Sequence, residues 1–209
     1  MLTVDLLDTL FRLALLLVAF PLHEYAHARV AVHFGDETPR RAGRLTLNPL
    51  RHLDPWGTLL FLLSGFGWAK PVPISPWALR QRWAYFWVAF AGPLSNLLLA
   101  LLAALLYRLV SPFLPLTFLG SLTRQFLAAV VFFDLLLFFF NLIPLPPLDG
   151  DKVLAGLWPR LWETYFAPLQ QHGFLILLVV LFVLPFFHID VLGWLVVGPT
   201  RWLSALLLG

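Results

Sequence analysis

The chain has 209 residues, of which 60% are hydrophobic and 12% are charged, with a formal net charge of +3. Average soluble proteins have roughly 45–50% apolar and about 25% charged residues, so a soluble enzyme of this size could not cover its apolar surface. The apolar content also excludes a disordered chain, and the absence of cysteine excludes a disulfide-linked secreted scaffold. The composition predicts a membrane protein that crosses the bilayer several times.

Apolar stretches of about 20 residues are long enough to cross a bilayer as a helix. We expect such spans at residues 10–33, 85–110, 125–143 and 174–187, and either a fifth span or a surface-lying tail at 191–208. The third stretch stops at three prolines, which cannot continue a helix. The predicted fold is an all-α polytopic membrane protein of four to five transmembrane helices, with residues 1–209 in a single domain.

The segment between the first two spans has a different pattern. Residues 44–48 alternate polar and apolar side chains, which is typical of a strand. The apolar run at 58–63 is too short to span a membrane and lies between two glycines. We therefore expect residues 43–74 to form a small membrane-associated β-hairpin region, whose strand edges could hold an unwound substrate by strand addition.

Basic residues predict the orientation in the membrane. Seven of them lie between the first two spans and two follow the third span, against three near the opposite ends. The positive-inside rule therefore places residues 35–82 and 144–172 in the cytoplasm. The residues counted are Arg40, Arg41, Arg44, Arg51, Lys70, Arg80 and Arg82, then Lys152 and Arg160, against Arg12, Arg108 and Arg124.

The first span contains a metal-binding pattern. His23, Glu24 and His27 read H-E-x-x-H, and the two histidines lie one turn apart on one helix face, so both can reach one metal ion. Glu24 lies beside them as a general base for water. A chance match would leave three ionisable residues in an apolar helix, where such groups are costly unless they are paired or liganded.

A catalytic zinc normally has three protein ligands and one open position. Asp149 follows the third span on the side towards which the histidines point, and it is the candidate third ligand. Two alternatives stay open from spacing alone: Asp149 could cap a following helix, and Asp151 could be the ligand in its place.

The combination of H-E-x-x-H in a first span with N-x-x-P-x-P-x-L-D-G at residues 141–150 resembles the site-2 protease family of intramembrane zinc metalloproteases (peptidase family M50). Segments 43–49, 54–58, 67–73 and 91–96 resemble, in the same order, its compact bacterial branch without PDZ or CBS domains. The resemblance implies one zinc ion per chain, held by His23, His27 and Asp149, with Glu24 as the catalytic base.

The same resemblance links two asparagines to the active-site neighbourhood. Asn96 and Asn141 match family positions associated with substrate binding or transition-state support, although Asn96 could instead bridge two helices by hydrogen bonds. Asp134 departs from the neutral polar residue expected in the third span, and either a functional or a helix-packing role is open for it.

The function expected from these features is zinc-dependent hydrolysis of peptide bonds within transmembrane segments of other membrane proteins. The expected partners are a transmembrane protein substrate and the lipid bilayer, with no nucleic acid, and the expected location is the bacterial cell membrane with the active site towards the cytoplasm. A zinc-binding adaptor without proteolysis is disfavoured by the intact Glu24. A metal transporter is disfavoured because the strong ligands form one cluster rather than a path.

Overall fold

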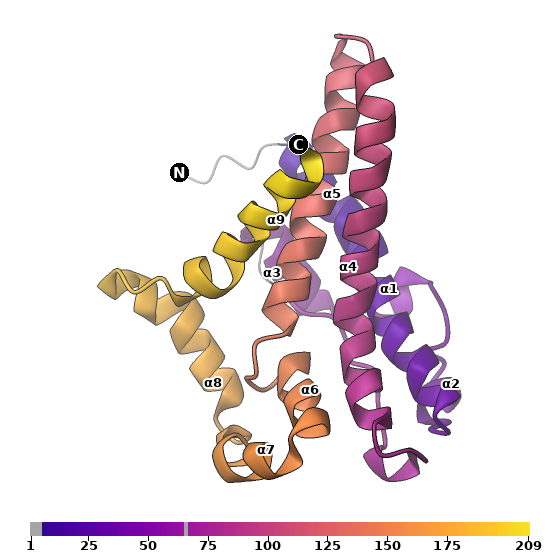
Figure 1. Cartoon of the computed structure of the whole chain (residues 1–209), viewed down its shortest axis with the longest axis vertical. Coiled ribbons are helices and arrows are strands. Elements are labelled where there is room, and N and C mark those ends of the chain that lie inside the picture. The colour runs from indigo at the N-terminus through magenta and orange to yellow at the C-terminus, as the bar shows by residue number, and fades with distance from the viewer. Residues whose placement is uncertain (1–5, 65–66) are drawn as a thin grey trace. The chain divides into compact units, whose positions relative to one another are not determined.

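The computed structural model describes residues 6–64 and 67–209, and the regular elements in these ranges are helices, with one isolated bridge between Leu53 and Ala69. The chain divides into two compact units, Met1–Gln81 and Arg82–Gly209. Figure 1 shows the elements of both units in the colours of the chain.

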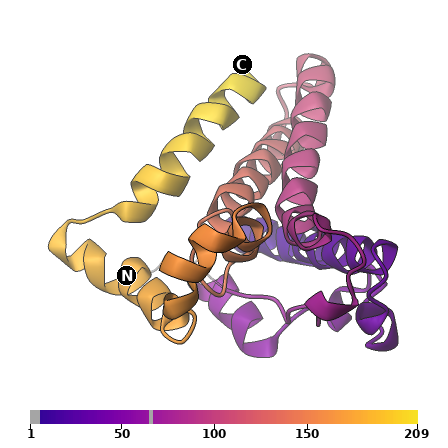
Figure 2. The ribbon, with the colours of Figure 1, turned by 60° about the horizontal axis from the view of Figure 1, so that its bottom comes forward.

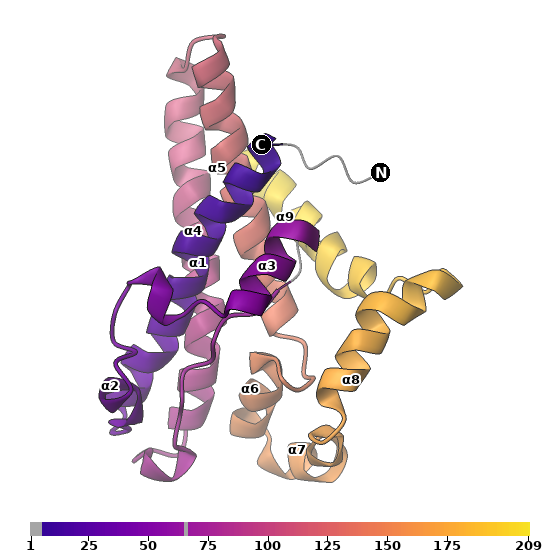
Figure 3. The ribbon, with the colours of Figure 1, turned by 180° about the vertical axis from the view of Figure 1, so that it is seen from behind.

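The first unit is built on α1 (Leu6–His33), a helix of 28 residues. It ends at Gly35, whose φ of +102° lies in the left-handed region that glycine adopts most easily. Helix α1 packs against α2 (Thr38–Arg41), η1 (Pro49–Arg51) and α3 (Pro55–Ser64), as seen in Figure 3. A last short 3-10 turn, η2 (Pro76–Ala78), precedes the second unit.

The β-hairpin region predicted at residues 43–74 is wrong, because no strand forms among its described residues. Helix α3 occupies the apolar run instead. Asp54 accepts hydrogen bonds from two amides of the first turn of α3, at 3.0 and 2.9 Å, and Pro55 has the φ of a first helical residue. Asn48 likewise accepts from an amide of η1 at 3.1 Å. These caps start helices after residues 44–48 and over residues 58–63, the two stretches predicted as strands.

Two long helices form the body of the second unit: α4 (Ala84–Val110) and α5 (Phe118–Asn141). They pack against each other and are joined through η3 (Ser111–Phe113). Small side chains let helices approach closely in a membrane protein. The core between them contains Ala100, Ala103, Ala104, Val131 and Leu135.

Short helices follow α5. Helix α6 (Asp149–Leu157) packs against α4 and is followed by α7 (Pro159–Tyr165) and η4 (Ala167–Leu169). A Cβ atom on Gly156 would lie 2.6 Å from the backbone nitrogen of Phe86, so this approach of α6 to α4 requires glycine.

The C-terminal part of the chain is interrupted where two further spans were predicted (Figure 2). The predicted span 174–187 is divided into α8 (Gly173–Leu178), the π turn η5 (Val179–Val183) and η6 (Leu184–Phe187), which ends at the left-handed His188. The predicted stretch 191–208 contains the π turn η7 (Gly193–Val197) and α9 (Gly198–Leu208).

Three helices in the described part of the chain are long and apolar enough to cross a membrane: Thr9–His33, Ala84–Phe113 and Phe118–Asn141. The prediction of four to five transmembrane helices is therefore not supported: Gly173–Phe187 is an apolar helix of fewer than 18 residues, and it stops after Pro185 at the left-handed His188. On α4, Leu98, Leu102 and Leu105 are each more than half exposed. Such an apolar outer surface indicates a membrane protein whose helices face lipid.

Candidate active site

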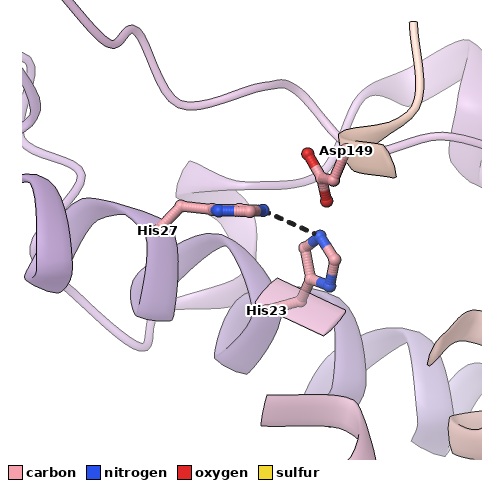
Figure 4. A group of neighbouring side chains, drawn as sticks. All are labelled: His23, His27 and Asp149. Carbon is pink, nitrogen blue, oxygen red and sulfur yellow. Dashed lines mark hydrogen bonds between the residues drawn. The ribbon is translucent and has the colours of Figure 1, made fainter. Parts of the chain in front are cut away.

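The two histidines of the H-E-x-x-H pattern meet on α1. His23 is 9% exposed and His27 is 6% exposed, and their Nε2 atoms lie 3.1 Å apart (Figure 4). Two nitrogens bound to one tetrahedral zinc at about 2.0–2.1 Å would be separated by roughly 3.3 Å. The pair therefore fits two neighbouring ligand positions of one zinc ion.

Glu24 lies on the same helix and is 8% exposed. Its Oε2 accepts a hydrogen bond from the backbone N–H of Val72 at 3.0 Å, across 48 residues of sequence. Sequence reasoning did not identify Val72. The only sequence signal is that Val72 stands between Pro71 and Pro73, so it carries the one backbone N–H of that tripeptide.

The segment that carries Val72, residues 70–75, is fixed by hydrogen bonds to the rest of the first unit. Lys70 N donates to His52 O at 2.7 Å. Arg44, which is 5% exposed, donates from Nη1 to Lys70 O and from Nη2 to Pro71 O, each at 3.2 Å, and also donates to Arg51 O. A cationic side chain thus holds the two carbonyls that precede Val72.

The far end of the 70–75 segment is held by Asp36, which is fully buried. Its Oδ2 accepts from Ser75 N at 2.7 Å and its Oδ1 accepts from Thr38 N at 2.9 Å. Burial raises the pKa of Asp36, but the hydrogen bonds from Thr38 and Ser75 and the charge of Arg41 outweigh burial, so the pKa lies below its ordinary value of 3.8. Asp36 is therefore a charged anchor for this segment.

Asp149 and Asp151 belong to the second unit. Asp149, which is labelled in Figure 4, is the first residue of α6 and is 8% exposed. The Nζ of Lys152 lies 3.4 Å from Asp149 Oδ1. Asp151 accepts from Trp162 Nε1 at 2.7 Å and from Gln170 Nε2 at 2.6 Å, so both of its oxygens are bonded within the unit. The ligand role of Asp149 stays a prediction.

The alternative role of Asp149 as a helix N-cap is wrong, because that position is taken by Leu148.

Position 150, the residue after Asp149, must be glycine. A Cβ atom on Gly150 would lie 2.3 Å from Leu142 O and 2.4 Å from Ile143 O. The start of α6 is thus pressed against the end of α5, which fixes where the Asp149 backbone lies within the second unit.

The two asparagines are also in the second unit. Asn96 is 1% exposed, and its amide nitrogen donates to Asp134 Oδ1 at 2.9 Å, which links α4 to α5. Asn141 donates to Leu137 O in its own helix at 3.0 Å. The first contact is the helix-bridging role that the sequence left open for Asn96, and the substrate-binding roles of both residues stay predictions.

No family model and no solved structure matches the chain. Curated relatives do match it. A Bacillus subtilis protein named "Putative zinc metalloprotease YwhC" is 43% identical over 174 residues, which is 81% of this chain and 78% of that protein.

Two mycobacterial proteins named "Putative zinc metalloprotease Rip2" are more distant. The one from Mycobacterium tuberculosis is 34% identical over 197 residues, covering 90% of this chain and 70% of that protein. The one from Mycolicibacterium smegmatis is 32% identical over 175 residues, covering 79% of this chain but only 64% of that protein. The match to YwhC covers most of both chains, and α1 carries the pair of histidines that can bind zinc. This chain therefore belongs to the zinc metalloprotease family of these relatives.

Proposed function

We propose that this chain is a site-2-type intramembrane endopeptidase, which hydrolyses peptide bonds in transmembrane segments of other membrane proteins. The observation that carries the proposal is the H-E-x-x-H site on α1, a helix that is long and apolar enough to cross a membrane. Relatives named as zinc metalloproteases support the class of reaction. The depth of the site along an apolar helix supports a substrate that is itself in the membrane.

The proposed zinc ion has two ligands from α1 and one from the second unit. His23 and His27 supply imidazole nitrogens, and Asp149 supplies a carboxylate oxygen. The chain has no cysteine, so a third ligand must be a histidine or a carboxylate. Asp149 is favoured over Asp151, because both oxygens of Asp151 are engaged by Trp162 and Gln170.

When bound, zinc would supply Lewis-acid polarisation of the scissile carbonyl and of water. Glu24 accepts a proton as the water oxygen attacks the carbonyl carbon. The C–N bond then breaks, and Glu24 returns the proton to the leaving amine nitrogen. The histidines hold their ring nitrogens close together because they lie one turn apart on one helix.

A transmembrane substrate must be unwound before it is cut, because a helix engages its own peptide groups in hydrogen bonds. Unwinding in hydrocarbon exposes polar groups at a cost of several kcal/mol. We therefore expect spans with glycine, proline or asparagine near the scissile bond to be cut faster than poly-leucine spans.

The test is cleavage of a single-span substrate by purified protein in lipid vesicles. Glu24→Gln should abolish cleavage, and a strong chelator should do the same. Added zinc should restore cleavage by the chelated enzyme. Glu37→Gln, which changes a partly exposed glutamate of the same unit that pairs with Arg40 at 3.2 Å, is the matched control and should cleave normally.

Cleavage that survives either Glu24→Gln or chelation would overturn the proposal. Zinc binding and substrate binding without any cleavage would instead identify a non-proteolytic adaptor. Zinc flux into sealed vesicles would identify a transporter.

A further inference from the structure

We infer that the peptide group between Pro71 and Val72 positions Glu24, and that Arg44 holds this peptide group in place. Val72 and Arg44 are thus positioning residues that act through Glu24, and the inference rests on the proposed function of Glu24 as the catalytic base. All of the contacts involved lie within the first unit.

The hydrogen bond to Glu24 comes from a segment that offers few donors. Proline has no backbone N–H, so the tripeptide 71–73 has a single amide hydrogen, that of Val72. The two prolines also favour extended backbone, for themselves and for the residue before each. The only donor of this stretch is directed to Glu24 Oε2, at 3.0 Å.

Arg44 acts on the other end of the same peptide group. Its Nη2 donates to Pro71 O, and this carbonyl shares one planar peptide unit with the N–H of Val72. Because the peptide unit is planar, holding its carbonyl oxygen restricts the direction of its N–H. The neighbouring carbonyl, Lys70 O, accepts from Nη1 of the same guanidinium, which adds a second point of attachment.

The charges reinforce this geometry. A guanidinium cation lies at the carbonyl end of the Pro71–Val72 peptide and a carboxylate lies at its N–H end, which matches the direction of the peptide dipole. Hydrogen bonds in such a series polarise and strengthen one another. Arg44 is 5% exposed and Glu24 is 8% exposed, so water screens this series weakly.

The consequence for catalysis is a carboxylate of fixed orientation. With Oε2 held by Val72, rotation of the Glu24 carboxylate is restricted, and the direction of Oε1 follows from it. A general base must be positioned before the reaction for its proton transfer to be efficient. Loss of the bond should therefore lower kcat and leave substrate binding intact.

The first experiment removes the donor. Val72→Pro should lower kcat by about 10- to 100-fold, which is the effect of one hydrogen bond to a charged group, with KM changed by less than about twofold and zinc content retained. Ile74→Pro places a proline in the same segment and leaves the Val72 N–H intact, so it should cleave at close to the wild-type rate.

The second experiment measures the hydrogen bond itself and needs no activity. Because 71–73 contains one amide, hydrogen exchange in that stretch reports on Val72 alone. Glu24→Ala should make this amide exchange at least about tenfold faster, as expected for the loss of one such bond, and Glu24→Gln, which keeps an acceptor oxygen, should do so less. Glu37→Ala should not change it.

Arg44 is tested by the same two measurements. Arg44→Gln should speed exchange at Val72 and lower kcat, Arg44→Lys should recover only part of both, and exposed Arg40→Gln should change neither. Unchanged exchange in Glu24→Ala, or a wild-type kcat in Val72→Pro, would overturn the inference. Activity that survives in Glu24→Gln would refute the proposed function, and the exchange data would still test the contact.

Discussion

Asp149 and Asp151 are two residues apart at the start of α6, yet their surroundings give them different roles. Asp151 is 4% exposed and accepts hydrogen bonds from Trp162 and Gln170, which belong to the segments after α6. It therefore ties α7 and η4 to α6. Asp149 lies beside Lys152 at 3.4 Å and is our proposed zinc ligand.

This difference predicts the effect of each substitution on zinc. His23→Ala, His27→Ala and Asp149→Ala should each reduce the bound zinc sharply from about one per chain, because a catalytic site holds zinc with three protein ligands. Asp151→Ala should retain zinc. It should instead lower the free energy of unfolding by about 1–3 kcal/mol, because the side chains of Trp162 and Gln170 lose the buried carboxylate that accepts their hydrogen bonds.

Elemental analysis of the purified variants measures the first effect, and thermal unfolding in detergent measures the second. Asp151→Asn keeps one acceptor oxygen and serves as the milder control. Loss of zinc in Asp151→Ala with zinc retained in Asp149→Ala would reverse the assignment.

Asp36 predicts a pH dependence of the first unit. Its pKa lies below 3.8 in the folded protein, so its charged form stabilises the fold at pH values above the ordinary pKa. This stabilisation is lost as the pH falls through the lowered pKa. We expect Asp36→Asn to lower the free energy of unfolding by about 1–3 kcal/mol at neutral pH and to lose less stability than the wild type on acidification below 3.8.

Thermal unfolding of both proteins across this pH range measures the effect. Glu37→Gln alters the neighbouring, partly exposed carboxylate and should leave the pH profile unchanged. Parallel profiles for the wild type and Asp36→Asn would contradict the assignment of Asp36 as a charged anchor.

The candidate site was predictable from sequence where its residues are close along the chain. His23 and His27 meet because helical spacing alone brings them to one face, and Glu24 is adjacent to His23 in the sequence. Val72 and Arg44 could not be found in this way. Their contacts with Glu24 and with the 70–75 segment use backbone groups across long sequence separations, and a backbone N–H or C=O leaves no mark in the identity of the residue.

At the scale of elements, long apolar runs predicted α1, α4 and most of α5, because length and apolarity decide a spanning helix. Short runs were less informative. Residues 58–63 are compatible with a buried strand or a helix, and the cap by Asp54 decided for a helix. Residues 174–187 are apolar along their length, but Pro185 and the left-handed His188 divide them from the next helix.

The pair of Asn96 and Asp134 predicts how strongly α4 and α5 are held together. Their hydrogen bond of 2.9 Å lies between buried side chains of the two helices. Hydrogen bonds between membrane helices contribute about 0.6–2 kcal/mol. Asn96→Ala and Asp134→Ala should each lower the free energy of unfolding by about this amount, whereas Asp134→Asn, which keeps an acceptor oxygen, should have a smaller effect.

A double-mutant cycle on unfolding in mild detergent measures the coupling directly. The double alanine variant should be destabilised by less than the sum of the single variants, because each single change already removes the bond. Additive effects would show that the two side chains do not stabilise each other. Loss of cleavage without loss of stability in Asn96→Ala would favour its alternative role in substrate binding.

At the scale of the whole molecule, the path of residues 173–209 bears on the topology. At one end, Gly173 is so close to Pro146 that a Cβ atom would lie 2.5 Å from Pro146 O. At the other end, Arg108 in the last turn of α4 donates to Leu206 O at 2.7 Å and to Leu207 O at 2.6 Å. The interrupted C-terminal segment therefore runs from the end of α5 to the opposite end of α4.

This path predicts the side of the membrane on which the C-terminus lies. Helix α4 has 27 residues and measures about 40 Å, which exceeds the roughly 30 Å of hydrocarbon. The positive-inside rule places Arg160 in the cytoplasm and the connection between α4 and α5 outside. A segment that begins beside Pro146 and ends beside Arg108 must then end outside, although neither half of it is long enough to cross alone. Tags after Gly209 and near Pro115 should both be accessible from outside the cell, and tags near Arg160 and within residues 36–41 should be accessible only after the membrane is opened.

Arg108→Ala should weaken the attachment of α9 without changing the side of the other tags. A cytoplasmic Gly209 beside an external Pro115 would mean that residues 173–209 turn back before reaching Arg108, and an external Arg160 would invert the orientation of the whole chain.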